Sequence, residues 1–260
     1  MSATHSLAAV VLAGGTADEE FQKVSGVTIR ALAPFRHSTM LQHVTSAITQ
    51  TTFPMSVNDL VVVADLPQGS GYRTISDTGT FTGNLCAGLQ EVSSYDLALV
   101  STADIPFITP ETITMFLSEA AKYMEDQDTA LVWPVVPVNL CYTNYPGIKL
   151  TAIKLREGFL TGGNVGLVRP QKLLSCLPAI NRAFDARKSP LKLAGILGPS
   201  VIARLLISQL AVPSILTTTF LENAVSKLIG GKARAVVCHL PEIATDIDRA
   251  SDYLAVTSSL

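Results

Sequence analysis

The 260-residue sequence is poor in charged residues, at 15%, and in aromatic residues, at 6%, and it has no excess of basic residues. Its net charge of −2 at neutral pH provides no basic surface for a nucleic acid, so we expect no nucleic acid partner. Hydrophobic residues make up 48% of the chain, which is ample for a buried core. A chain of this length suits one large domain.

Cysteine is scarce and scattered. The four cysteines form no C-x-x-C pair and have no histidine at zinc-ligand spacing; they are Cys86, Cys141, Cys176 and Cys238. We expect them to be buried small apolar residues in a reducing compartment. The N-terminus has no basic segment before an apolar run, and Leu7–Leu12 is too short for the core of a signal peptide. The sequence therefore predicts a cytoplasmic protein.

Long apolar runs are also absent. The longest uncharged stretch of the Leu- and Ile-rich region Leu191–Ile229 is Leu205–Leu221, and polar residues and a proline interrupt it. A transmembrane helix needs about 20 predominantly apolar residues. We predict amphipathic or buried helices in this region and no transmembrane segment. Peripheral membrane contact or a homodimer interface is the alternative use of the region, so both a monomer and a homodimer remain open.

Short apolar runs alternate with helical patterns along the chain. Nearly continuous apolar runs are typical of strands buried on both faces, and they occur at Leu7–Leu12, Leu60–Ala64, Leu97–Ser101 and Leu131–Val136. The alternation predicts an α/β fold, a three-layer α/β/α sandwich around a mainly parallel, doubly wound sheet. We expect a single domain over residues 1–260, with a mostly helical apolar insertion at about 171–230.

The first predicted strand leads into paired glycines, Ala13-Gly14-Gly15. Neither G-x-G-x-x-G nor G-x-x-x-x-G-K-[ST] is present, which argues against a standard dinucleotide fold and a P-loop. Paired glycines at a strand end let the backbone pass close to a bound ring or phosphate, although an ordinary turn is the alternative. Arg30 follows and could reach phosphates from this loop, or be a surface arginine.

Aspartates follow two later apolar runs. Asp104 comes after Leu97–Ser101, and a carboxylate at a strand end is well placed to ligate Mg²⁺, although it could equally cap a turn. Asp246 and Asp248 point to the same side if their segment is extended. Because Asp248 is suited to be the N-cap of a final helix from Arg249, Asp246 is the preferred metal ligand. We expect Asp252 to lie on the surface.

Five segments, in this order and spacing, resemble the MobA-like NTP transferase family across nearly the whole chain. They are Val10-Val11-Leu12-Ala13-Gly14-Gly15, Arg30-Ala31-Leu32-Ala33-Pro34 leading into Thr39-Met40-Leu41, Thr102-Ala103-Asp104-Ile105-Pro106, Thr161-Gly162-Gly163-Asn164, and Asp246-Ile247-Asp248. The resemblance implies a nucleotide-diphospho-sugar transferase (GT-A-like) fold. It also implies a Mg²⁺-dependent nucleotidyltransferase that moves a nucleoside monophosphate from an NTP to a small-molecule acceptor, phosphorylated or sugar- or cofactor-like, with release of pyrophosphate.

The same resemblance implies roles for individual residues. The nucleotide would be bound by Leu12, Ala13, Gly14, Gly15, Thr82, Gly83 and Asn84. Arg30 would contact phosphates where related enzymes commonly have a lysine, and it and Asp104 would be catalytic. Asp104 and Asp246 would hold Mg²⁺, and Gly163 and Asn164 would face the acceptor.

The segment after the double glycine departs from the family. Family members often carry an arginine there, whereas this chain has Thr16-Ala17-Asp18-Glu19-Glu20, with Lys23 and Arg30 as the cations that follow. Acidic residues beside a triphosphate are unfavourable unless they point away or help to hold the metal. Two other functions therefore remain: a glycosyltransferase that uses a nucleotide-sugar donor, and a catalytically inactive nucleotide-binding regulatory module.

Overall fold

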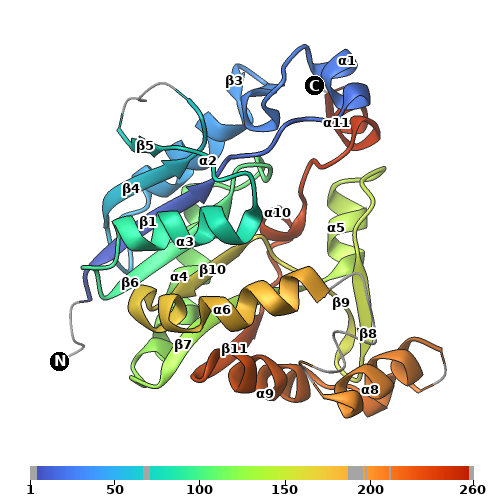
Figure 1. Ribbon diagram of the computed structural model, residues 1–260. Coiled ribbons are helices and arrows are strands. Elements are labelled where there is room, and N and C mark those ends of the chain that lie inside the picture. The colour runs from blue at the N-terminus through green and yellow to red at the C-terminus, as the bar shows by residue number, and fades with distance from the viewer. Residues whose placement is uncertain (1–4, 67–70, 187–195, 197, 211, 258–260) are drawn as a thin grey trace.

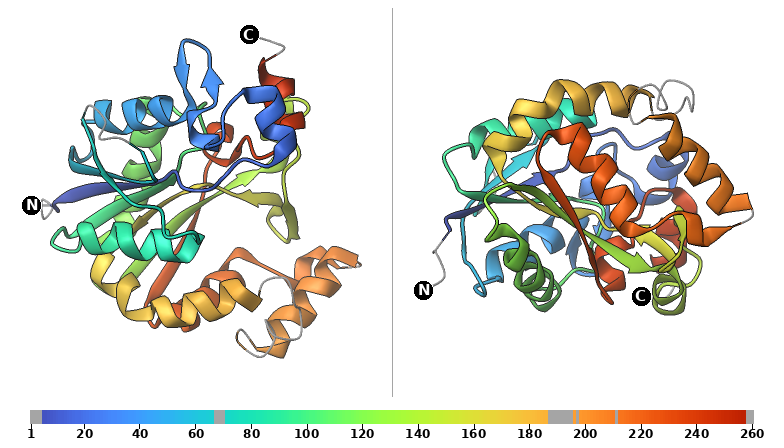
Figure 2. Two further views of the ribbon diagram at one scale, coloured as in Figure 1. Left: turned by 45° about the horizontal axis from the view of Figure 1, so that its top comes forward. Right: turned by 90° about the horizontal axis from the view of Figure 1, so that it is seen from below.

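The described part of the chain forms three layers, with a sheet between two sets of helices (Figure 1). The structure is a computed structural model that describes residues 5–66, 71–186, 196, 198–210 and 212–257. The right-hand view of Figure 2 shows the two helical layers on opposite sides of the sheet. The predicted α/β/α sandwich is confirmed.

The sheet is mixed and mostly parallel. Its nine strands are β1 (Leu7–Leu12), β4 (Val57–Val63), β5 (Arg73–Ile75), β6 (Leu97–Thr102), β7 (Thr129–Pro137), β8 (Ala152–Leu155), β9 (Gly158–Gly162), β10 (Val165–Val168) and β11 (Lys232–Val237). The order is β5-β4-β1-β6-β10-β7-β9-β8, and β11 pairs with β7. β5, β4, β1 and β6 are mutually parallel, whereas β10 runs antiparallel between β6 and β7. A separate small hairpin joins β2 (Pro34–Phe35) and β3 (Ser38–Thr39).

Helices occupy most of the remaining chain. They are α1 (Glu19–Ser25), α2 (Met40–Gln50), α3 (Phe81–Glu91), α4 (Pro110–Met124), α5 (Val138–Asn144), α6 (Pro170–Ala186), α8 (Pro199–Leu210), α9 (Thr218–Ile229), α10 (Pro241–Ala244) and α11 (Ala250–Thr257), with short 3₁₀ turns at Arg30–Leu32 and Pro213–Ile215. The predicted start of α4 is confirmed, because the Thr109 hydroxyl accepts a hydrogen bond from the Thr112 amide and Pro110 is the first helical residue.

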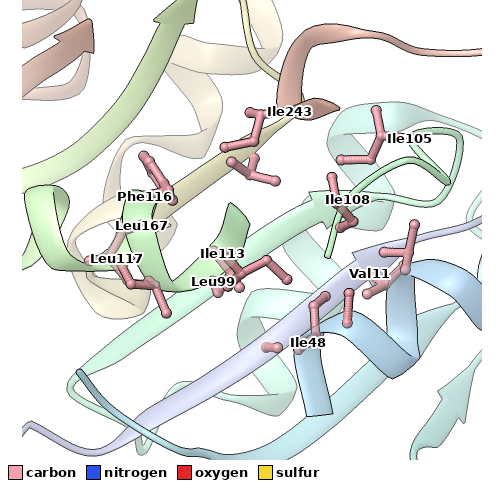
Figure 3. Packing of buried hydrophobic residues seen from close by; sticks show 14 of the residues in the cluster. Val11, Ile48, Leu99, Ile105, Ile108, Ile113, Phe116, Leu117, Leu167 and Ile243 are labelled. Carbon is pink, nitrogen blue, oxygen red and sulfur yellow. The ribbon is translucent and has the colours of Figure 1, made fainter. Parts of the chain in front are cut away.

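The core on one face of the sheet packs α2 and α4 against β1 and β6. Figure 3 shows Val11 and Leu99 of the sheet among Ile48 of α2 and Ile113 and Phe116 of α4. These side chains are almost completely buried. At about 25 cal/mol per Å² of apolar surface, such a core supplies the main free energy that holds the layers together.

The opposite face is covered by α3, α6 and α9. Their apolar residues Leu89, Leu173 and Ile229 are buried against strand residues such as Val10 and Val63. Because alternate residues of β1 enter opposite cores, the near-continuous apolar character of that strand follows from burial on both faces.

The apolar region before β11 is helical where it is described. α8 exposes Leu206, Ile207 and Leu210, of which Leu210 is 85% exposed. Within the described residues, no helix combines the length and the apolar character needed to cross a bilayer. The division into one domain with an insertion at about 171–230 stays a prediction. Residues 187–195, 197 and 211 of this region lie outside the described residues.

All four cysteines are free thiols. Cys141 and Cys238 are buried as expected, whereas Cys86 and Cys176 are half-buried. The expectation of four buried cysteines is therefore wrong for two of them, because Cys86 of α3 and Cys176 of α6 lie on helix positions that the sheet only partly covers.

The end of the chain returns to its beginning. Tyr253 of α11 packs on Phe21 of α1, with ring centroids 5.2 Å apart, and its hydroxyl donates to the Pro34 carbonyl. Figure 1 shows α11 beside α1, on the opposite side of the molecule from α8. This packing returns the segment with Asp246 and Asp248 to the edge of the sheet where β1 and β6 end.

Candidate active site

The register of the sheet places two of the predicted motifs side by side. β1 and β6 are parallel, and Leu12 pairs with Thr102 at their ends. The Ala103 amide donates to the Leu12 carbonyl at 3.1 Å. Gly14 and Asp104, each two residues beyond this pair, therefore lie at the same edge. Ligands of α/β sheets bind beyond the carboxyl ends of the strands.

Backbone hydrogen bonds attach the C-terminal aspartates to this edge. The Ile247 amide donates to the Asp104 carbonyl at 2.8 Å, so Asp104 lies next to the segment from Asp246 to Asp248. Asn164 joins the same network, since its amide donates to the Ile243 carbonyl and its carbonyl accepts from Thr102. Segments separated by more than 60 residues thus meet through their main chains.

Three carboxylates gather at this junction. One oxygen each of Asp104, Asp246 and Asp248 lies within 4.8 Å of the other two. Burial raises the pKa of Asp246 to about 7, and repulsion from Asp104 and Asp248 adds to the rise. Burial also raises the pKa of Asp104. Since like charges held this close oppose ionisation, the cluster favours a counter-charge.

Arg30 supplies part of that counter-charge. Its guanidinium Nη1 donates to Asp248 Oδ1 at 2.5 Å. Among the described residues, the Asp248 side chain accepts no hydrogen bond from the start of α11; the Arg249 amide there donates instead to the Asp252 carboxylate. The expected surface position of Asp252 is wrong, because this carboxylate is 1% exposed and turns inward to accept that hydrogen bond.

A cavity lies between the glycine loop and the acidic cluster. It is lined by Leu12, Ala13, Gly14, Gly15, Arg30, Ala31, Ala103 and Asp104. One cavity therefore contains the predicted nucleotide loop, the predicted phosphate ligand Arg30 and the predicted metal ligand Asp104. Thr82, Gly83 and Asn84 do not line it, since they form the start of α3 just behind the loop.

Asn84 supports the glycine loop through Asp77, a residue that the sequence motifs did not single out. Asp77 accepts hydrogen bonds from the Gly15 amide at 3.0 Å, the Asn84 amide group at 2.8 Å and the Gly79 amide at 2.8 Å. These bonds lower the pKa of Asp77. A Cβ at Gly14 would lie 2.6 Å from the side chains of both Asn84 and Asp77, so a larger residue there would displace the side chains that support the loop. Asp77 lies two residues beyond the end of β5, just as Asp104 lies two residues beyond the end of β6, so a search for aspartates after every strand would have found it.

The acidic segment after Gly15 forms a helix start. Asp18 caps α1, since its carboxylate accepts from the Phe21 amide at 2.8 Å, and Glu19 and Glu20 are exposed in the first turn. Negative charge is favourable at that end of a helix. None of these three carboxylates lines the cavity of Gly14 and Arg30.

A second cavity lies on the other side of the acidic cluster. Its lining includes Asp246, Asp248, Lys149, Asn164 and Arg249. Of the two predicted acceptor residues, Asn164 lines it and Gly163 does not. A Cβ at Gly163 would come within 2.6 Å of Ile243 and Pro134, so this glycine permits the close packing that positions Asn164.

A divalent cation fits the acidic cluster. Asp104 Oδ1 is buried and has no hydrogen-bond partner among the described residues. Carboxylate oxygens are the ligands that Mg²⁺ prefers, and Mg²⁺ commonly takes one or two of them together with substrate phosphates. Asp104, Asp246 and Asp248 would hold the ion here, and it would offset the repulsion that adds to the raised pKa values of Asp104 and Asp246.

Comparisons with known proteins agree with this geometry. The MobA-like NTP transferase domain matches residues 9–145. A solved structure described as a hypothetical transferase from Thermus thermophilus is 31% identical, with a TM-score of 0.79 over 95% of this chain and 99% of its own. No curated protein matches the chain.

More distant structures share the fold. CMP:2-keto-3-deoxy-manno-octonic acid synthetase, solved in complex with CTP, is 14% identical with a TM-score of 0.59, and 98% of each chain is covered. The 4-diphosphocytidyl-2C-methyl-D-erythritol synthase of Anaerococcus prevotii is 8% identical with a TM-score of 0.57, and the match covers 99% of this chain and 97% of its own. The nucleotide-diphospho-sugar transferase-type fold is thereby confirmed.

Proposed function

The chain belongs to the MobA-like NTP transferase family and is a nucleotidyltransferase, and on this basis we propose a specific reaction. In this reaction the enzyme transfers a nucleoside monophosphate from an NTP to a phosphorylated, sugar-like or cofactor-like small molecule. The reaction depends on Mg²⁺ and releases pyrophosphate. Because NTPs are cytoplasmic metabolites, we propose that the protein works in the cytoplasm.

The main support for this proposal is the position of the buried polar atoms that have no hydrogen-bond partner among the described residues. Among the described residues, three buried side-chain atoms lack a hydrogen-bond partner: Arg30 Nε, Thr102 Oγ1 and Asp104 Oδ1. All three belong to the end of β6 or to the cavity beside it. An unpaired buried polar group costs about 1–3 kcal/mol, so a ligand that supplies an anion to Arg30 and a cation to Asp104 would recover that free energy. A metal-bound triphosphate has both charges.

The residues support the reaction by positioning and by charge. The loop Leu12–Gly15 would receive the nucleotide and is supported from behind by Asn84. Thr82 and Gly83 would help to bind the nucleotide from the start of α3. Arg30 would leave Asp248 to contact the phosphates. Mg²⁺ at Asp104 and Asp246, with Asp248 beside them, would supply positive charge to the phosphate oxygens during transfer.

The transfer needs no covalent enzyme intermediate. An acceptor oxygen attacks the α-phosphorus in line, the bond from the α-phosphorus to the bridging oxygen breaks, and pyrophosphate leaves with the electron pair. Asn164 would orient the acceptor from the other cavity beside the acidic cluster, and Gly163 would act through the close packing that positions Asn164. An acceptor phosphate is already ionised, so no general base is required.

Thermal unfolding with the four NTPs tests the site. We expect at least one NTP with Mg²⁺ to raise the melting temperature, by roughly 5–10 °C at a hundredfold excess over the dissociation constant. Asp104→Asn and Asp246→Asn should each remove the Mg²⁺-dependent part of this shift and nearly abolish pyrophosphate release. The measurement is differential scanning fluorimetry, followed by phosphorus NMR with the small-molecule fraction of a cell extract as the source of acceptor.

Asp128→Asn is the matched control, because the Asp128 side chain is 75% exposed and lies outside both cavities. Full activity in both site variants would refute the metal assignment. Release of a nucleoside diphosphate in place of pyrophosphate would identify a glycosyltransferase, and NTP binding without any turnover would identify a regulatory module.

A further inference from the structure

The cavity beyond the acidic cluster is lined by two cations that form no ion pair within the described part of the chain. Lys149 and Arg249 both line it and both are exposed. No carboxylate of the described residues lies within ion-pair distance of the Lys149 ammonium or the Arg249 guanidinium. By contrast, Arg30 on the other side of the cluster is paired with Asp248.

Asn164 lines the same cavity, and backbone hydrogen bonds hold it in place. Its backbone is bonded on both sides, to Thr102 and to Ile243, whereas its side-chain amide makes no hydrogen bond to the described residues. A fixed backbone with an available amide is suited to orienting a ligand. The amide therefore adds a neutral hydrogen-bonding group to a polar lining that includes Lys149, Arg249 and two carboxylates.

The charges of the cavity determine what it binds. Asp246 and Asp248 line it together with Lys149 and Arg249, so an anion that enters meets two cations and two carboxylates. A divalent cation at the carboxylates reverses this balance toward positive charge. The planar guanidinium of Arg249 matches the paired oxygens of a phosphate or a carboxylate, and Lys149 adds a point charge.

We propose, on the basis of the nucleotidyltransferase function above, that this cavity is the acceptor site and that the acceptor carries an oxyanion, either a phosphate monoester or a carboxylate. Lys149 and Arg249 bind the oxyanion, and Asn164 orients it beside the acidic cluster. Its binding is coupled to the divalent cation, because the cation neutralises Asp246 and Asp248. Lys149 and Arg249 are thus specificity-determining residues.

Inorganic phosphate is the probe for this site. Because Arg30 in the glycine cavity can also take phosphate, the titrations use the full chain with Arg30→Ala, and dissociation constants are measured by calorimetry with and without Mg²⁺. We expect Lys149→Ala and Arg249→Ala each to weaken phosphate binding about tenfold, as the loss of one charge-assisted hydrogen bond predicts. Omission of Mg²⁺ should weaken binding by a similar factor in the parent chain.

Lys154→Ala is the matched control, since Lys154 is an exposed lysine of the neighbouring β8 that does not line the cavity. Unchanged phosphate binding in both site variants, or an equal loss in the control, would overturn the proposal. Competition by acetate would assign the acceptor to the carboxylates, and phosphate binding without acetate competition would assign it to the phosphate monoesters.

Two experimental outcomes distinguish a failure of the acceptor site from a failure of the nucleotidyltransferase function on which it rests. If an NTP with Mg²⁺ raises the melting temperature while Lys149→Ala and Arg249→Ala leave phosphate binding unchanged, the acceptor site is refuted and the nucleotidyltransferase function stands. If no NTP binds but phosphate binding still depends on Lys149, Arg249 and Mg²⁺, the proposed function is refuted and the oxyanion site stands.

Discussion

The two sides of the acidic cluster are built differently. On the proposed nucleotide side, Gly14 lies so close to Asp77 and Asn84 that an added Cβ would displace their side chains, and Arg30 is held by an ion pair. On the acceptor side, Lys149 and Arg249 are exposed and unpaired among the described residues. One side is preorganised by packing, and the other presents free charges to solvent.

The family match over residues 9–145 covers the glycine-loop cavity and ends before the cations of the second cavity. Residues 9–145 contain the glycine loop, Arg30, Asp77 and Asp104, whereas Lys149, Asn164 and Arg249 lie beyond it. A tightly packed nucleotide side admits few sequences, because each side chain has a defined contact to make. An open acceptor side can vary with the substrate. We therefore expect substitutions to be costly on the first side and selective on the second.

Gly14→Ala should have the largest effect. The new Cβ would lie 2.6 Å from Asn84 and Asp77, and overpacking of this kind costs about 1–3 kcal/mol. We expect a lower free energy of unfolding in urea and weaker NTP binding. Gly162→Ala on the acceptor side is the control, since nothing lies within 4 Å of its added Cβ. Equal losses in the two variants would contradict the division into a packed and an open side.

Arg30→Ala should act on NTP binding more than on stability. The ion pair with Asp248 is partly exposed, with side chains 29% and 55% exposed, so its loss should cost less than about 1 kcal/mol of unfolding free energy. NTP affinity should fall about tenfold, because a charge-assisted hydrogen bond to phosphate is lost. Arg249→Ala should leave NTP affinity nearly unchanged. Calorimetry of both variants decides whether each cation serves only one substrate.

Asp77→Asn should have the smallest effect, and one that depends on pH. The folded-state pKa of Asp77 is lowered below 3.8 by the hydrogen bonds from Asn84, Gly79 and Gly15. Its contribution to stability is therefore present above about pH 4 and is lost as the pH falls through the folded-state pKa. We expect the variant to be about 1 kcal/mol less stable at pH 7. Urea titrations should show this difference shrink as the pH falls below about 4; a constant difference would contradict the assignment.

Sequence reasoning recovered four strands of the sheet, β1, β4, β6 and β7, because each contains a nearly continuous apolar run. β1 and β6 are apolar enough to be buried on both faces, and the glycines and Asp104 follow them directly. It also recovered the starting point of α4 from Thr109 and Pro110. It missed Asp77, because β5 is only three residues long and half-exposed, so no apolar run marked it.

The sequence by itself determined the α/β layers and the edge at which the glycine loop and Asp104 meet, since parallel strands bring their carboxyl ends together. The tertiary structure decided which distant groups share that edge. It joined Asp248 to Asp104 and Asp246, buried Asp252, and left Lys149 and Arg249 without an ion-pair partner among the described residues. These outcomes depend on how α10 and α11 return across the sheet, and that path is fixed by packing between segments far apart in the chain rather than by local periodicity.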